Sequence, residues 1–158
     1  MKASAPARRS KTERLLTALD SLARRRGRMP DLPEHLALGE AGEDAAFFEL
    51  RRKGYMVVAR RWRSGDVPGD LDLIAWQGPM LCFVEVKTRS ARDLTPAETA
   101  VDDHKKRVLR RLARRYVRQL PLKEMPPVRF DVMSVYMEPD KAVEFEHFEA
   151  TFGWGGGN

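Results

Sequence analysis

Two charged side chains interrupt a segment of the sequence that otherwise has the pattern of a buried β-strand. In residues 80–88, the two-residue period of a strand places Glu85 and Lys87 on one face and Val86 on the other. The run from Leu81 to Val86 is so apolar that we expect a central strand, where an ionic side chain without a partner costs free energy. Glu85 and Lys87 are therefore candidates for a functional site.

The segment before this strand supplies further carboxylates. Residues 70–76 also alternate as a strand, with Asp70 and Asp72 on one face. The opposite face then consists of Leu71, Leu73 and Ala75. Residues 77–79, Gln-Gly-Pro, are a turn signal, so we predict a hairpin that brings Asp72 close to Glu85.

Two carboxylates and an ammonium group on neighbouring strands suit metal-dependent phosphodiester hydrolysis. Carboxylate oxygens favour Mg²⁺ or Mn²⁺, whereas the presence of a single cysteine, Cys82, excludes a zinc site built from thiolates. Such a cation lowers the pKa of bound water and offsets the charge that builds on a phosphate. The alternative is a structural ion pair between Lys87 and Asp72 or Glu85. Two acids with one base leave excess negative charge, which favours a bound cation.

Two predicted helices each carry a charged residue on an apolar face. Residues 36–53 have the pattern of a helix, and Glu43 lies within its apolar stripe. Glu43 either reaches water from the rim of the stripe or belongs to the site. A second helix is predicted to start at the capping residue Thr95 and to run to residue 119, with Lys105 in its apolar stripe. Lys105 either extends to solvent or reaches a substrate phosphate.

The remaining patterns complete an α/β arrangement. Strands are predicted at residues 55–63 and 128–136, and a last strand at residues 143–148. The order is helix, three strands, helix and one or two strands, which predicts a mixed sheet flanked by helices. Arg129 and Asp131 alternate with apolar neighbours on one strand, and we expect a structural role in a cross-strand or helix-cap ion pair, with membership of the site as the alternative.

Positive charge is concentrated at the N-terminus of the 158-residue chain. The net charge is +6, and residues 1–29 hold nine basic residues against two acidic ones. We predict a basic arm with a short helix and a linker at residues 1–34, one domain at residues 35–153 and a flexible tail at residues 154–158. The arm is either a solvated tail or a phosphate-binding segment.

Composition argues against membrane and secreted classes of protein. No apolar run approaches the roughly 18 residues that a transmembrane helix needs, and the N-terminus has no apolar signal core. The single cysteine allows no intrachain disulfide. We therefore expect a cytoplasmic protein without a membrane partner.

Several blocks of the sequence, taken in order, resemble one family. They are Gly42-Glu43, Gly54-Tyr55, Trp62-Arg63, Gly-Asp-Leu-Asp-Leu-Ile-Ala at 69–75, Phe-Val-Glu-Val-Lys-Thr-Arg at 83–89, Lys105, and Arg-Phe-Asp-Val at 129–132. This order resembles that of the YraN-like family, also called UPF0102, over about residues 38–152. Two positions depart from the usual pattern of the family. Asp70 stands where glutamate is usual, and Arg61 stands where many members have asparagine.

The resemblance implies a fold and a chemistry. The YraN-like family is similar to the restriction-endonuclease-like superfamily and to archaeal Holliday-junction resolvases, which implies a PD-(D/E)XK central mixed sheet flanked by helices. It also implies a metal site in which Glu43, Asp72 and Glu85 hold Mg²⁺ or Mn²⁺ with the Val86 carbonyl. Glu43 would act directly or through a water, and Lys87 would orient the nucleophile.

We therefore expect a Mg²⁺-dependent endonuclease-type domain that acts on DNA, branched or damaged DNA included; DNA versus RNA stays open. The residues 104–118 contain no acidic side chain, so this helix is either a solvated face or a surface for backbone phosphates. The predicted nucleic-acid contacts are Arg63, Arg89, Lys105, Lys106 and Arg107. The alternatives are a nucleic-acid-binding module without turnover and a protein-interaction role for the arm. A homodimer also stays open, because resolvase-like relatives act on symmetric substrates as dimers.

Overall fold

The computed structural model describes residues 34–91 and 101–155, together with Leu15 and Ala18. The arm predicted at residues 1–34 therefore lies outside the described residues, apart from Leu15, Ala18 and Glu34. Leu15, one of its leucines, is 60% exposed. The capping residue predicted at Thr95 also lies outside them.

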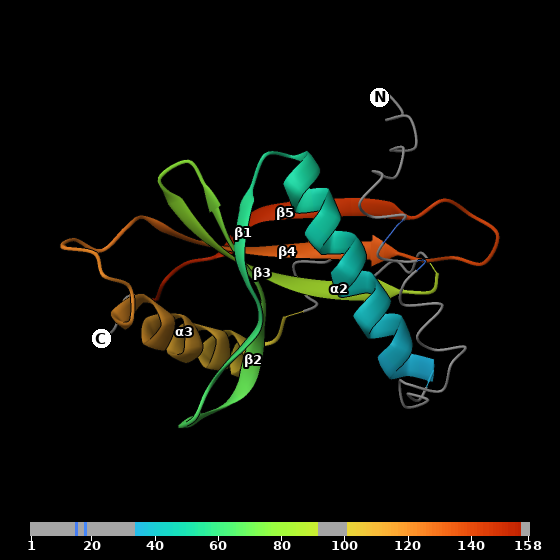
Figure 1. Ribbon diagram of the computed structural model, residues 1–158. Coiled ribbons are helices and arrows are strands. Elements are labelled where there is room, and N and C mark those ends of the chain that lie inside the picture. Colours follow the sequence, from blue (N-terminus) through green and yellow to red (C-terminus); the bar gives the residue numbers. More distant parts are fainter. Residues whose placement is uncertain (1–14, 16–17, 19–33, 92–100, 156–158) are drawn as a thin grey trace.

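Five strands form one mixed sheet in the order of the chain (Figure 1). They are β1 (Met56–Ser64), β2 (Val67–Gln77), β3 (Met80–Arg89), β4 (Val128–Tyr136) and β5 (Glu144–Phe152). Neighbouring strands are antiparallel except β3 and β4, which are parallel. A parallel pair needs a crossover connection, and helix α3 (Asp103–Arg118) lies in that connection.

Two helices cover opposite faces of the sheet and divide the core in two (Figure 1). Helix α2 (Glu34–Arg52) buries Ala46 and Leu50 against one face, which includes Val84 and Val86 of β3. Helix α3 packs on the other face, and the residues buried there include Leu81, Phe83, Leu109, Leu112 and Phe130. The alternation predicted for β3 is thus confirmed, and so is the predicted mixed α/β sheet between helices.

The predicted start of the second helix is wrong within the described residues. Asp102 has extended backbone angles, and helix α3 begins at Asp103. The Asp102 carboxylate accepts a hydrogen bond of 2.7 Å from the Lys105 amide, which is the geometry of a strong N-cap. A helix that continues through Asp102 is therefore excluded, because the backbone of this N-cap residue is extended and α3 begins only after it.

The last strand is longer than the predicted 143–148 and runs to Phe152. Its alternation is hidden by a bulge, where Ala150 adopts a φ of +53° and its amide donates to Asp131. Beyond the strand, Trp154 stacks on Phe130 with 5.8 Å between ring centroids. The packed part of the chain therefore includes Trp154. Among the described helices, none is both long enough and apolar enough to cross a bilayer.

Candidate metal centre

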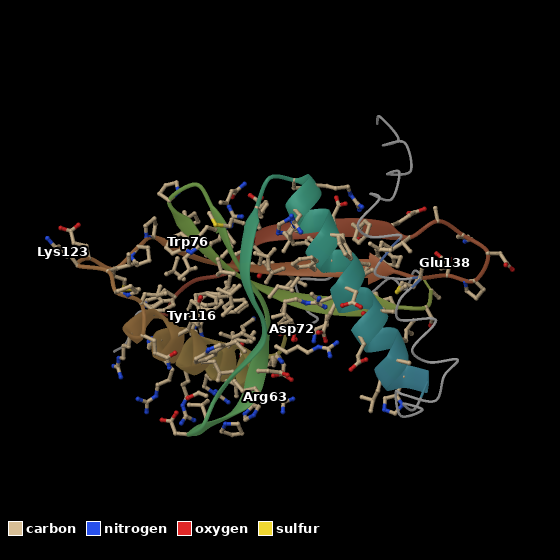
Figure 2. The ribbon with its side chains drawn as sticks, viewed as in Figure 1. Arg63, Asp72, Trp76, Tyr116, Lys123 and Glu138 are labelled. Carbon is tan, nitrogen blue, oxygen red and sulfur yellow. The ribbon has the colours of Figure 1, made fainter. Side chains whose placement is uncertain are left out.

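The site lies where strand β2 separates from β3. Backbone pairing between these strands ends at Leu73 and Val84, and the next residue of β2 is Asp72. Asp72 Oδ2 instead accepts a hydrogen bond of 2.7 Å from the Val86 amide. A side chain thus replaces the backbone carbonyl as the partner of that amide. Asp72 therefore stands at the opening of the hairpin, and in the view of Figure 2 it lies between β2 and helix α2.

The same separation changes which way one leucine points. Leu71 packs in the core beneath α3, whereas Leu73 packs beneath α2. The prediction that Leu71 shares a face with Leu73 is wrong. Simple alternation breaks down between these two leucines, whose partners on β1, Trp62 and Arg60, flank Arg61 with its φ of +47°.

Glu85 is the buried centre of the site. It is 5% exposed, and its Oε1 atom accepts from Lys87 Nζ at 2.9 Å and lies 3.2 Å from Lys105 Nζ. Its Oε2 atom is buried without a hydrogen-bond donor among the described residues. A buried carboxylate oxygen without a partner carries a large desolvation cost. An oxygen of this kind is suited to a cation.

The surroundings of Asp72 disfavour the ionised form of its carboxyl group. Burial first, and then repulsion from Glu85, raise the pKa of Asp72 to about 7, against the Val86 amide and Lys105, which lower it. Lys105 shows the complementary effect. Burial lowers the Lys105 pKa, but attraction to Glu85 and Asp72 outweighs it, so that the pKa rises. The two carboxylates thus repel each other in a place where a cation would relieve the repulsion.

The structure adds a second base to the balance of charge. The sequence predicted an excess of negative charge, from two acids, Asp72 and Glu85, and one base, Lys87. In the structure Lys105 of α3 also contacts Glu85, so two positive charges offset the two negative ones. Both lysine side chains are about one-third exposed. The strongest indication of a cation is therefore the unpartnered Glu85 Oε2 atom rather than an excess of charge.

Glu43 lies near this pair but has a partner of its own. Arg61 Nε donates to Glu43 Oε2 at 2.5 Å, and Arg61 Nη1 donates to Glu40 Oε1 at 2.9 Å. Glu43 still contributes repulsion that raises the Asp72 pKa. Within the described ranges, no three His, Cys, Asp or Glu side chains form a group that could hold a metal. The structure thus brings Asp72 and Glu85 together and places Glu43 beside them, bound to Arg61.

Arg61 was not among the site residues predicted from the sequence. Its sequence signals are a basic pair, Arg60-Arg61, on a strand that follows an acidic helix, and its departure from the asparagine of many family members. In the structure both arginines bind that helix, Arg60 through Asp44 and Arg61 through Glu43.

Glycine allows helix α2 to approach the site. A Cβ atom built on Gly42 would overlap the Thr88 hydroxyl group of β3. The absence of a side chain therefore lets the helix backbone lie against the strand directly after Lys87. This contact fixes the position of Glu43, the next residue of the helix.

The predicted nucleic-acid contacts are spread over several elements. Arg63 of β1 is 76% exposed on its side chain and lies 3.5 Å from Asp70. Arg89 ends β3 beside Tyr136 in the register with β4. Lys106 lies 3.5 Å from Asp103, and Arg107 is exposed on α3. Only Lys105 of the five contacts a carboxylate of the site.

Helix α3 presents a stripe of exposed arginines, which we call the arginine stripe. Its members are Arg107, Arg111, Arg115 and Arg118. They follow a spacing of three or four residues, so they lie on one side of the helix. Arg110 and Arg114, in contrast, donate to the carbonyl oxygens of Gly153 and Trp154 and are committed to the C-terminal segment.

Asp131 belongs to a separate structural network. Its carboxylate accepts from Arg129, His147 and the Ala150 amide, all at 2.8–3.0 Å. Burial raises the Asp131 pKa, but these hydrogen bonds outweigh it and the pKa is lowered. The structural ion pairing expected of Arg129 and Asp131 is confirmed: they pair with each other along β4, and Arg129 also pairs across strands with Glu149 of β5.

Comparison with known proteins places the chain in a family. A UPF0102 protein of Koribacter versatilis is 51% identical over 112 residues, which cover 71% of this chain and 77% of the relative. A UPF0102 protein of Solibacter usitatus is 44% identical over 131 residues, or 83% and 93% of the two chains. The family model described as "Uncharacterised protein family UPF0102" matches residues 42–135, a range that contains Glu43, Asp72, Glu85 and Lys87. The chain therefore belongs to the UPF0102 family.

Proposed function

We propose that this protein is a divalent-metal-dependent nuclease with a restriction-endonuclease-like fold, and that it hydrolyses phosphodiester bonds of DNA. The observation that carries the proposal is the buried, unpartnered Oε2 atom of Glu85 beside the Asp72 carboxylate. The fold supports it, because the β2–β3 hairpin and the crossover helix α3 bring acids and lysines from three elements to one place.

The residues present fit a hard divalent cation. Asp72, Glu85 and the Val86 carbonyl would hold Mg²⁺ or Mn²⁺, and such ions commonly use one or two carboxylates and keep several waters. Bound there, the cation would acidify a water molecule and stabilise charge on the phosphate. A site with two carboxylates is thus sufficient, even with Glu43 bound to Arg61.

The lysines act on the solvent side of the carboxylates. Lys87 and Lys105 share one oxygen of Glu85, and both side chains remain partly exposed. Their ammonium groups are anchored at a buried carboxylate, so they are preorganised to attract a phosphate and to hold an attacking water. Helix α3 carries Lys105 at one end and the arginine stripe along its outer side, which suits contact with the phosphates of a duplex.

A cleavage assay tests the proposal. Linear, flap and four-way-junction DNA and duplex RNA are incubated with the protein in Mn²⁺, in Mg²⁺ and in EDTA, beside Glu85→Gln and Lys87→Ala. We expect metal-dependent cleavage that falls by about 100-fold or more in both variants. Glu49→Gln is the matched control, because Glu49 pairs with Arg52 on the exposed side of α2.

Calorimetric titration with Mn²⁺ accompanies the assay, so that an unsuitable substrate is not mistaken for an absent site. The proposal fails if no substrate is cleaved and the protein binds no Mn²⁺. Cleavage of RNA alone would retain the chemistry and change the substrate.

A nucleic-acid-binding module without turnover is the second candidate, and the arginine stripe is the observation that favours it. This candidate predicts salt-sensitive binding of DNA that Glu85→Gln and Lys87→Ala both retain, with no cleavage by the unaltered protein.

A further inference from the structure

Arg61 occupies a strained position directly beside the candidate metal centre. Its φ of +47° lies in the left-handed region, which a long side chain rarely adopts and which costs about 1–3 kcal/mol. Arg61 lies between Arg60 and Trp62, whose partners on β2, Leu73 and Leu71, flank Asp72. Strain of this kind persists only where other contacts fix the residue, and here two carboxylates of α2 do so.

The guanidinium group of Arg61 binds both of those carboxylates, through two of its three nitrogens. Nε binds Glu43 and Nη1 binds Glu40, and attraction to both raises the Arg61 pKa, with the Glu43 hydrogen bond as the largest cause. An arginine whose charge is neutralised twice is a poor ligand for a substrate phosphate. Its effect is instead on Glu43, which would otherwise present a free carboxylate beside Asp72.

A balance of formal charge shows what Arg61 does for the site. The carboxylates linked around Asp72 are Glu40, Glu43, Asp72 and Glu85, and the cations that contact them are Arg61, Lys87 and Lys105. Four negative and three positive charges leave a net of −1. A single divalent cation changes this to +1, whereas a second would change it to +3. Like charges at such short range are costly in a partly buried site.

We infer that Arg61 is a built-in cation that takes the place of a second metal ion, so that the protein binds a single divalent cation per chain. The inference rests on the proposed metal centre and deepens it. Glu43 is then held as the partner of Arg61 rather than as a metal ligand, which accounts for the absence of a third acidic ligand among the described residues.

Mn²⁺ binding to the full chain tests the inference without any substrate. Calorimetry gives the stoichiometry, and the paramagnetic resonance signal of free Mn²⁺ counts the bound ions independently. The key variant is Arg61→Asn, because asparagine tolerates the left-handed backbone and leaves Glu43 without its cation. Arg61→Lys retains the positive charge. Arg60→Asn is the matched control, since Arg60 pairs with Asp44 of the same helix.

We expect the unaltered protein, Arg61→Lys and Arg60→Asn to bind a single Mn²⁺, and Arg61→Asn to bind a second. Adding Glu43→Gln to Arg61→Asn should return the stoichiometry to a single ion. Circular dichroism confirms that each variant is folded. Two ions on the unaltered protein, or a single ion on Arg61→Asn, would contradict the role inferred for Arg61 and leave the proposed metal centre standing. If no form binds Mn²⁺, the proposed metal centre itself fails.

Discussion

Two buried aspartates of the sheet show how surroundings decide the cost of a charge. Asp131 accepts from Arg129, His147 and the Ala150 amide, and its pKa is lowered. Asp72 accepts from the Val86 amide and is repelled by Glu85, and its pKa is raised to about 7. The charge of the first is satisfied by the protein itself, whereas the charge of the second is only partly offset by the Val86 amide and Lys105. Perturbed carboxyls of the second kind mark functional sites more often than structural ones.

Asp72 predicts how the stability of the metal-free protein depends on pH. The unfolded pKa is about 4, so the folded state binds the extra proton between about pH 4 and pH 7. The free energy of unfolding should therefore fall as pH rises through this window, by a few kcal/mol attributable to Asp72, and level off above it. Asp72→Asn retains an acceptor for the Val86 amide and should be the more stable form at about pH 8.

Urea unfolding in EDTA at about pH 5 and pH 8 checks this, with the difference between the two proteins isolating Asp72 from other titrating groups. A difference that does not change with pH would contradict the raised pKa.

Asp131 contributes to stability with the opposite dependence on pH, and over a different pH range. Because the Asp131 pKa is lowered, its contribution to stability is present at neutral pH and is lost only below about pH 4.

At the scale of elements, the backbone of helix α2 at Gly42 packs against the Thr88 side chain of strand β3, and this contact sets the position of Glu43. Gly42→Ala would drive a methyl group into Thr88. We expect a loss of about 1–3 kcal/mol in the free energy of unfolding, the range typical of an overpacked core. Gly39→Ala is the matched control on the same helix, because nothing lies within 4 Å of its added Cβ atom.

The control should gain up to about 1 kcal/mol, since alanine favours a helix more than glycine does. Thermal unfolding of both variants measures the contrast. Equal stabilities would mean that α2 can shift away from β3 at little cost, and that Gly42 does not fix the position of the helix.

Periodicity predicted β3 and its facing correctly because strand alternation is a local property of the chain. It failed at Leu71, where the hairpin opens, and at Asp102, whose extended backbone caps the start of α3 where the Thr95 pattern predicted a continuous helix. Periodicity could not predict the ion pairs of the site, and the reason is different. Whether Lys105 reaches Glu85, or Arg61 reaches Glu43, depends on how helices pack on the sheet, which sequence spacing does not encode.

At the scale of the whole molecule, basic charge is divided between two uses. Arg110 and Arg114 secure the C-terminal segment, whereas the arginine stripe faces solvent. Asp66 offsets part of the stripe through Arg115. The exposed remainder lies on the helix that carries Lys105 to the carboxylates, so binding of a polyanion and the site chemistry share one element.

The arginine stripe should contribute to the salt dependence of DNA binding. We expect the combined change Arg107→Ala and Arg111→Ala to weaken duplex DNA binding and to reduce the slope of log affinity against log salt by about 0.9 per lost contact. Arg51→Ala removes an exposed arginine from α2, and this control should leave the slope unchanged. Fluorescence anisotropy over a salt series measures both. An unchanged slope in the double variant would place the phosphates elsewhere.

The hydrogen bond between Asp72 Oδ2 and the Val86 amide has a consequence for coordination. Since Oδ2 is committed to the backbone, Oδ1 is the oxygen left for a cation, and Asp72 becomes a monodentate ligand. The same holds for Glu85, whose Oε1 atom is taken by the two lysines. An ion held by these two oxygens and the Val86 carbonyl would keep several of its waters. Substrate oxygens would then enter by exchanging with labile water, while the protein ligands stay in place.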